Sequence, residues 1–160
     1  MDRWLLYCSG TVIFSCHGHY GAYLKKLIKR HSLEGMVTFM GPLSAPKMKE
    51  AFLRSNVFVL PSTIENSPNS LGEAMLLGVP CVASCVGGVQ DMLADRMEGY
   101  MYPVNDTALL AHYIDKVFSD DDAAYAMGKR AKEHAYRTHD PVKNVEDLIE
   151  IYHKILSSEE

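Results

Sequence analysis

The chain has 160 residues, of which 48% are hydrophobic and 22% are charged, and its formal net charge at neutral pH is −4. This length can bury a sizeable core, so we expect residues 1–160 to form a single domain. The small negative charge argues against a nucleic-acid-binding protein, and no apolar run approaches a membrane span. Since the first residues do not match a signal peptide, we expect a cytoplasmic protein or one at the cytosolic face of a membrane.

The first 54 residues predict two strands and two helices. Strands are expected at residues 4–7 and 36–40, with residues 9–18 as a loop, and helices at residues 20–31 and 44–54. The first helix carries leucine and isoleucine on one face and four basic residues on the other. We interpret the basic face as solvated rather than as a phosphate site. It comprises Lys25, Lys26, Lys29 and Arg30.

Residues 57–83 predict a strand-helix-strand unit. The apolar run at residues 57–60 is stopped by Pro61 and suits a strand buried on both faces of a parallel sheet. Ser67-Pro68-Asn69-Ser70 supplies helix-start residues, Gly78 ends the helix, and a second strand follows at residues 80–83. Such a unit places the helix N-terminus at the carboxyl edge of the sheet, where anions bind in open α/β folds.

The remaining residues predict one more strand and four helices. A short helix is expected at residues 89–94 and a strand at residues 100–102. Three helices follow, starting at Asn105 or Asp106, at Asp120 and at Pro141. The last carries an apolar stripe that we expect to be buried, made of Val142, Val145, Leu148, Ile149, Tyr152, Ile155 and Leu156. Alternating strands and helices predict a doubly wound, Rossmann-like α/β fold, a parallel sheet with helices on both faces.

No residue pattern predicts a metal site. The four cysteines lack zinc-knuckle spacing, so we expect reduced thiols that serve in packing. His17 and His19 form a possible ligand pair, but no further ligand lies near them in the sequence. The acidic run at residues 120–122 is explained by the favourable placement of negative charge at a helix N-terminus.

The stretch from Leu60 to Ser84 resembles the signature of the group 1 retaining glycosyltransferases of the GT-B fold. Glu65 and Glu73 are separated by seven residues within LPSTIENSPNSLGEAMLLGVPCVAS, and Gly87-Gly88, Gly99-Tyr100 and Pro103 continue the match. The resemblance extends over nearly the whole chain. It departs from the family at residues 66–68, where Asn-Ser-Pro replaces the usual Gly-Phe-Gly.

The resemblance implies roles for particular residues. Glu65 is expected to contact the transferred sugar as the catalytic-site carboxylate, and Glu73 to accept hydrogen bonds from the ribose. The backbone amides of Asn69, Ser70 and Leu71 are expected to hold the diphosphate, and the turn at Gly41 to hold the base. The substrate would be a nucleoside-diphosphate sugar, with no metal or other cofactor. The acceptor would be a glycan or a lipid-linked glycan, and peripheral membrane association of the parent protein is compatible with this.

The resemblance also implies that the chain is a part of the enzyme. Family members place a strand with a Gly-Arg segment and a Lys-Gly segment ahead of this region, and a further domain that holds the acceptor. Here the chain is expected to start at the family's second strand, with the first strand missing. No basic residue near the start stands in a matching context, neither Arg3 nor Lys25, Lys26, Lys29 and Arg30. We therefore expect the C-terminal, donor-binding half of a GT-B enzyme, inactive as an isolated fragment. The donor sugar, its base, the acceptor and the pathway stay open.

Other interpretations stay open at this point. Ser70 and Glu73 have the spacing of a capping box, in which Glu73 would bond the Ser70 amide instead of a ribose. Glu65 could be a solvated loop acid, and the glycine pair a simple turn. The whole chain could instead belong to a nucleotide-sugar epimerase or phosphorylase of the same architecture, or to a non-catalytic α/β binding module.

Overall fold

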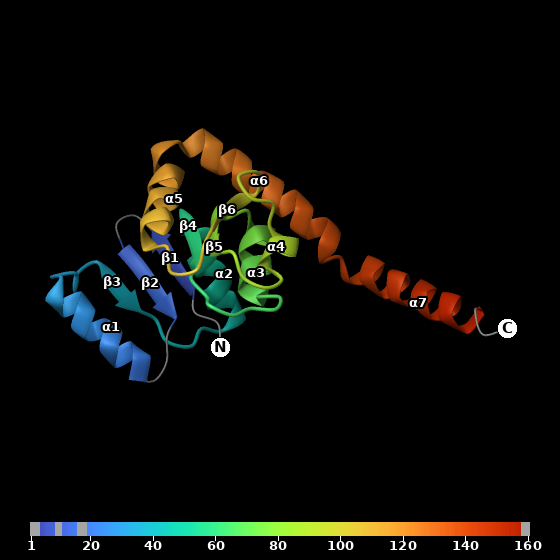
Figure 1. Ribbon diagram of the computed structural model, residues 1–160, viewed down its shortest axis with the longest axis horizontal. Helices are drawn as coiled ribbons and strands as arrows, with labels where there is room; N and C mark the ends of the chain where they lie inside the picture. Colours follow the sequence, from blue (N-terminus) through green and yellow to red (C-terminus); the bar gives the residue numbers. More distant parts are fainter. Residues whose placement is uncertain (1–3, 9–10, 16–18, 158–160) are drawn as a thin grey trace.

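A computed structural model describes residues 4–8, 11–15 and 19–157 (Figure 1). The strands are β1 (Trp4–Cys8), β2 (Thr11–Ser15), β3 (Val37–Phe39), β4 (Val57–Leu60), β5 (Cys81–Ser84) and β6 (Gly99–Tyr102). The helices are α1 (His19–Arg30), α2 (Ala45–Leu53), α3 (Asn69–Leu77), α4 (Val89–Met92), α5 (Thr107–Ser119), α6 (Asp121–Thr138) and α7 (Pro141–Ser157).

The strands form one six-stranded sheet in the order β3-β2-β1-β4-β5-β6. Neighbours β2–β3, β4–β5 and β5–β6 pair in parallel, whereas β1 runs antiparallel to both β2 and β4. The predicted doubly wound α/β fold is confirmed, with β1 as an antiparallel exception. Only residues 9 and 10 separate β1 from β2, and a connection that short can join only antiparallel neighbours.

The loop predicted at residues 9–18 is wrong over Thr11–Ser15, which form β2. This segment is rich in the β-branched and aromatic residues that favour strands. The remaining residues of that loop before α1 lie outside the described part of the chain.

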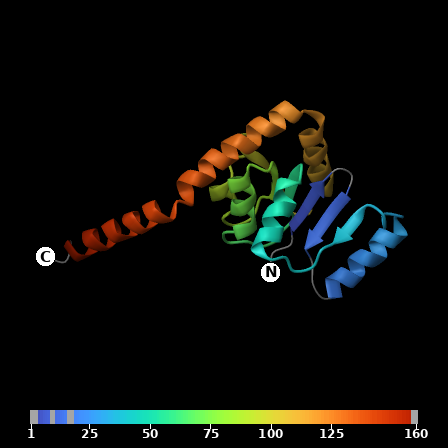
Figure 2. The same ribbon diagram turned by 180° about the vertical axis from the view of Figure 1, so that it is seen from behind.

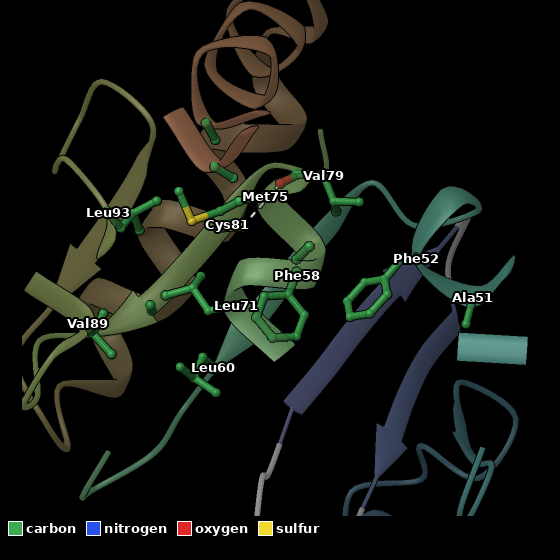
Figure 3. Close-up of a cluster of buried hydrophobic side chains, with 14 residues drawn as sticks. Ala51, Phe52, Phe58, Leu60, Leu71, Met75, Val79, Cys81, Val89 and Leu93 are labelled. Carbon is green, nitrogen blue, oxygen red and sulfur yellow. Dashed lines mark hydrogen bonds between the residues drawn. The ribbon is translucent and has the colours of Figure 1, made fainter. Parts of the chain in front are cut away.

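Two apolar clusters lie on the two faces of the part of the sheet formed by β4, β5 and β6. The larger joins α2, α3 and α6 to strands β4 and β5, and the rings of Phe52 and Phe58 meet within it at 5.5 Å between centroids (Figure 3). The smaller places α5 over the opposite side of β4, β5 and β6, with Tyr113 and Val117 buried. The four residues of β4 are all buried, so the prediction of a strand buried on both faces at residues 57–60 is confirmed.

Buried tyrosines lie in the cluster under α5. Tyr100 and Tyr113 stack with ring centroids 4.7 Å apart. Tyr102 is buried two residues further along β6, and this burial raises its pKa to about 12 because the charged phenolate is poorly solvated there. The folded chain therefore keeps this phenol neutral at pH values where the unfolded chain loses its proton.

Replacing Tyr102 with phenylalanine is expected to flatten the alkaline loss of stability. The stability contributed by the raised pKa is complete below pH about 10 and is lost as the pH rises towards about 12. The free energy of unfolding of both proteins, measured by urea denaturation across this range, tests this. The wild type should lose stability more steeply than Tyr102→Phe, and parallel curves would contradict the assignment.

Helix α7 extends away from the sheet as an arm (Figures 1 and 2). None of its residues is buried, so the predicted burial of its apolar stripe is wrong. The spacing of apolar residues predicted the helix itself correctly. The apolar stripe of α7 faces solvent because no other described element packs against it. Among the described residues, no helix has both the length and the apolar character needed to cross a membrane.

Candidate functional site

Parallel strands place several loops at one edge of the sheet. The chain leaves β3, β4 and β5 at this edge, and the loops that follow carry Gly41, Glu65 and the Gly87-Gly88 pair. Helix α3 also begins here, at Asn69. The carboxyl edge of an open α/β sheet is where such folds bind ligands.

The first turn of α3 has backbone donors without partners. Pro68 is the N-cap residue and makes no side-chain cap hydrogen bond. The amide of Leu71 donates to the Pro68 carbonyl oxygen at 3.0 Å, so the predicted role of Leu71 as a ligand donor is weakened. Among the described residues, the amides of Asn69 and Ser70 donate to no backbone oxygen. Free amides and the positive end of the helix dipole suit an anion.

The Ser70 hydroxyl is a third unsatisfied group at this helix start. The residue is 5% exposed, and its hydroxyl oxygen has no hydrogen-bond partner among the described residues. A buried polar atom without a partner costs free energy, so such atoms are rare and commonly mark a place where a ligand or water binds. Asn69 is exposed, so the helix start is open to solvent.

The capping-box interpretation of Glu73 is wrong. Ser70 is the second residue of α3 and not its cap, and α3 has no side-chain cap hydrogen bond. Glu73 is exposed and lies one turn into the helix, where it makes no hydrogen bond or ion pair with the described residues. Its carboxylate is therefore available to a ligand.

Glu73 lines a groove between α2 and α3 with a volume of about 430 Å³. The groove is mainly apolar, with Lys49 and Glu73 as its charged residues. Its lining is Leu43, Ala45, Met48, Lys49, Phe52, Glu73, Leu76 and Leu77. An apolar groove with a carboxylate in its wall can bind a planar ring between its apolar side chains. The carboxylate can then accept hydrogen bonds from hydroxyl groups of the same ligand.

The carboxylate of Glu65 is held by its own loop. The Ser62 hydroxyl donates to Glu65 Oε1 at 2.5 Å, and the buried Ser84 hydroxyl donates to the Ser62 carbonyl oxygen at 2.6 Å. The first bond holds Glu65 within the loop after β4, and the second ties that loop to the end of β5. Glu65 is half-buried and restrained, so the interpretation of it as a freely solvated acid does not fit.

The glycine pair lies directly against this loop. A Cβ atom on Gly87 would lie 1.8 Å from the Glu65 carbonyl oxygen, and one on Gly88 would lie 1.8 Å from that of Asn66. Gly87 also has a φ of +45°, in the left-handed region that favours glycine. The pair is therefore more than a simple turn, because it allows the loop after β5 to support the backbone that carries Glu65.

The structure brings together some of the predicted site residues and not others. Glu73 shares the groove with Leu43, which follows the predicted base-binding turn. Gly41 adopts the left-handed conformation of a tight turn, with a φ of +63°, but does not line the groove. Glu65 lies outside the groove as well. Sequence reasoning missed Ser62 and Lys49, although Ser62 precedes Glu65 by three residues in the same motif.

No metal centre occurs in the part of the chain that the structure describes. No group of three or more histidine, cysteine, aspartate or glutamate residues could hold a metal ion there. The side chain of Asp120 accepts a hydrogen bond from the Ala123 amide at 2.9 Å, so the acidic run begins α6 as predicted. Burial raises the pKa of the Cys81 thiol, which is consistent with a packing role. The His17 and His19 side chains lie outside the described residues.

The fold and the free donors at α3 define a Rossmann-like α/β domain with a helix start suited to an anion. Residues 3–134 match the family described as glycosyl transferases group 1. The chain belongs to this family.

Individual relatives agree with the family assignment. The chain is 30% identical over 131 residues to N-acetyl-alpha-D-glucosaminyl L-malate synthase from Bacillus anthracis, a match that covers 82% of this chain and 34% of that protein. The fold is similar to that of sucrose-phosphate synthase from Thermosynechococcus elongatus, with a TM-score of 0.81 at 24% identity, over 91% of this chain and 38% of that one.

It is also similar to Anabaena HepE in complex with UDP-glucose, with a TM-score of 0.78 at 23% identity, over 84% of this chain and 37% of that one. Both structural likenesses concern the fold alone. The chain spans about a third of the length of the relatives it matches.

Proposed function

We propose that this chain is the donor-binding half of a retaining glycosyltransferase that moves a sugar from a nucleoside-diphosphate sugar to a glycan or lipid-linked acceptor. The observation that carries the proposal is the start of α3, where the Asn69 and Ser70 amides and the buried Ser70 hydroxyl have no partner among the described residues. An anionic diphosphate supplies acceptors to all of these groups.

The donors at α3 can also act during the reaction. As the bond between sugar and diphosphate breaks, negative charge builds up on the leaving diphosphate. Fixed amides at a helix start stabilise that charge without having to reorganise. The proposal assigns no metal or other cofactor, so removal of divalent cations with EDTA should leave nucleotide binding unchanged.

The two glutamates receive different roles. Glu73 accepts hydrogen bonds from the ribose hydroxyls while the base enters the groove between α2 and α3, an assignment supported by its free carboxylate in the groove wall. Glu65 contacts hydroxyl groups of the sugar, supported by the Ser62 bond that fixes one of its oxygens and leaves the other available. The proposal also includes a glycan or lipid-linked acceptor. It further includes peripheral association of the parent protein with the cytosolic face of a membrane.

Calorimetric titration of the chain with UDP, GDP and ADP tests the proposal. We expect one of the three to bind at a single site, and inorganic phosphate to compete with it weakly because it reaches only the α3 donors. If none of the three binds, the chain lacks a donor site of the proposed kind. Product analysis with a full-length enzyme then separates sugar transfer from epimerisation or phosphorolysis of the same donor.

A further inference from the structure

Helix α1 presents a concentrated positive charge on a chain that is otherwise acidic. Residues 19–40 hold four of the chain's 16 basic residues and one of its 20 acidic residues. The rest of the chain therefore holds 12 basic and 19 acidic residues. Residues 19–40 therefore attract anions, whereas the rest of this chain, whose net charge is −4 overall, repels them.

The basic residues of α1 share its outward face. Leu24, Leu27 and Ile28 are half-buried on the inner side of the helix, whereas the basic side chains are exposed. Both views place α1 at one end of the molecule, beside β3, the edge strand of the sheet (Figures 1 and 2). We call this outward face the α1 basic face, made of Lys25, Lys26, Lys29 and Arg30.

The α1 basic face has no acidic partner in the described part of the chain. Lys26, Lys29 and Arg30 form no ion pair there, and the Lys25 ammonium lies 5.7 Å from the centre of the Phe39 ring. Lys25 and Lys29, and likewise Lys26 and Arg30, are spaced four residues apart, where like charges repel each other. Lys29 and Arg30 interact favourably with the helix C-terminus, but that does not account for Lys25 or Lys26.

We infer that the α1 basic face, which the sequence alone led us to interpret as merely solvated, docks the protein on the anionic surface of a lipid bilayer. Long basic side chains on one helix face can reach lipid phosphates together, and exposed apolar residues beside them suit the region between head groups and acyl chains. Tyr23 on α1 is an exposed large apolar residue, as are Met36 and Met40, which flank β3 in the sequence. The acidic remainder of the chain is repelled by the same surface, which fixes α1 as the side that approaches it.

A nucleic acid fits these observations less well. Binding to nucleic acid is driven by phosphate neutralisation over an extended basic surface, whereas the basic cluster here is confined to one short helix. The inference does not depend on nucleotide binding at α3, because the docking measurement below uses no nucleotide.

Vesicle co-sedimentation tests the docking. Phosphatidylcholine vesicles with and without phosphatidylglycerol are mixed with the wild type and with a triple variant, Lys26→Gln, Lys29→Gln and Arg30→Gln. The matched control is Lys129→Gln, Arg137→Gln and Lys154→Gln, which removes the same charge from exposed positions on α6 and α7. Circular dichroism establishes that all three proteins are folded.

We expect the wild type to bind only the vesicles that contain phosphatidylglycerol, and to release them as salt rises. The α1 variant should bind about a hundredfold more weakly, since each basic residue near an anionic surface contributes about fivefold. The control should stay within about threefold of the wild type. The single variant Lys26→Gln should lose about fivefold, which provides a test if the triple variant does not fold.

Three results would overturn the docking inference. The wild type could bind neutral and anionic vesicles equally, or the control variant could lose as much affinity as the α1 variant. A DNA duplex could also bind more tightly than the anionic vesicles, which would identify the basic face as a nucleic-acid surface.

Discussion

Replacing Gly87 with alanine is expected to destabilise the chain by about 3 kcal/mol, through steric overlap and backbone strain acting together. The new Cβ would lie 1.8 Å from the Glu65 carbonyl oxygen, a backbone atom that cannot rotate away as a flexible side chain could. The φ of +45° adds strain, because a residue with a Cβ is unfavourable in that conformation. One of the two loops must therefore move.

Urea denaturation measures the loss, and Gly21→Ala is the matched control. Gly21 lies in α1, where an added Cβ would meet no atom within 4 Å. Alanine is also the better helix former, so the control should be unchanged or stabilised by up to about 1 kcal/mol. If Gly87→Ala cost as little as its control, the support of the Glu65 loop by the glycine pair would be wrong.

The same substitution bears on the site. Because the loop after β4 carries Glu65, its displacement should weaken binding of a nucleoside-diphosphate sugar more than binding of the matching nucleoside diphosphate. Comparison of the two ligands on Gly87→Ala therefore separates a local change at Glu65 from a general loss of folded protein, which would affect both ligands alike.

Replacing Glu73 with glutamine is expected to weaken nucleoside diphosphate binding by about 1.5 to 3 kcal/mol, or roughly ten- to a hundredfold. The carboxylate forms charge-assisted hydrogen bonds to ribose hydroxyls in the proposed complex, and an amide of the same shape forms weaker ones. The free energy of unfolding should stay within about 0.5 kcal/mol of the wild type, since Glu73 is exposed and has no partner among the described residues.

Glu133→Gln on α6 serves as the control for Glu73→Gln. It removes one exposed carboxylate from a helix outside the groove and should leave both affinity and stability unchanged. If Glu73→Gln lowered the free energy of unfolding but kept the affinity for the nucleoside diphosphate, Glu73 would have a structural role and not a ligand-binding one.

The centre of the chain could be predicted from the sequence because several local signals there agree. The apolar run of β4 ends at Pro61, and α3 ends at Gly78, whose φ of +76° shows the left-handed conformation expected after a helix. The strand at Thr11–Ser15 was missed because serine and glycine on both sides suggested a loop. Its own residues favour a strand, and sheet pairing with β1 and β3 outweighs the flanking signals.

Other features depend on contacts between distant segments. The spacing of apolar residues in α7 shows which face could be buried, but nothing local shows what would cover it. Two contacts join segments that lie about twenty residues apart in the sequence. One is the close approach of Gly87 to Glu65, and the other is the hydrogen bond from Ser84 to Ser62. The glutamate pair was visible as a motif, whereas the groove that Glu73 lines exists only once α2 packs beside α3.

Amide chemical shifts recorded by NMR during titration with the nucleoside diphosphate that binds test the central claim most directly. The account predicts that the Asn69 and Ser70 amides show the largest changes, with smaller ones around Leu43 and Glu73, and that the phosphate-free nucleoside leaves the first two nearly unaffected. Largest changes at another helix start, with Asn69 and Ser70 unmoved, would contradict the assignment of the diphosphate to α3.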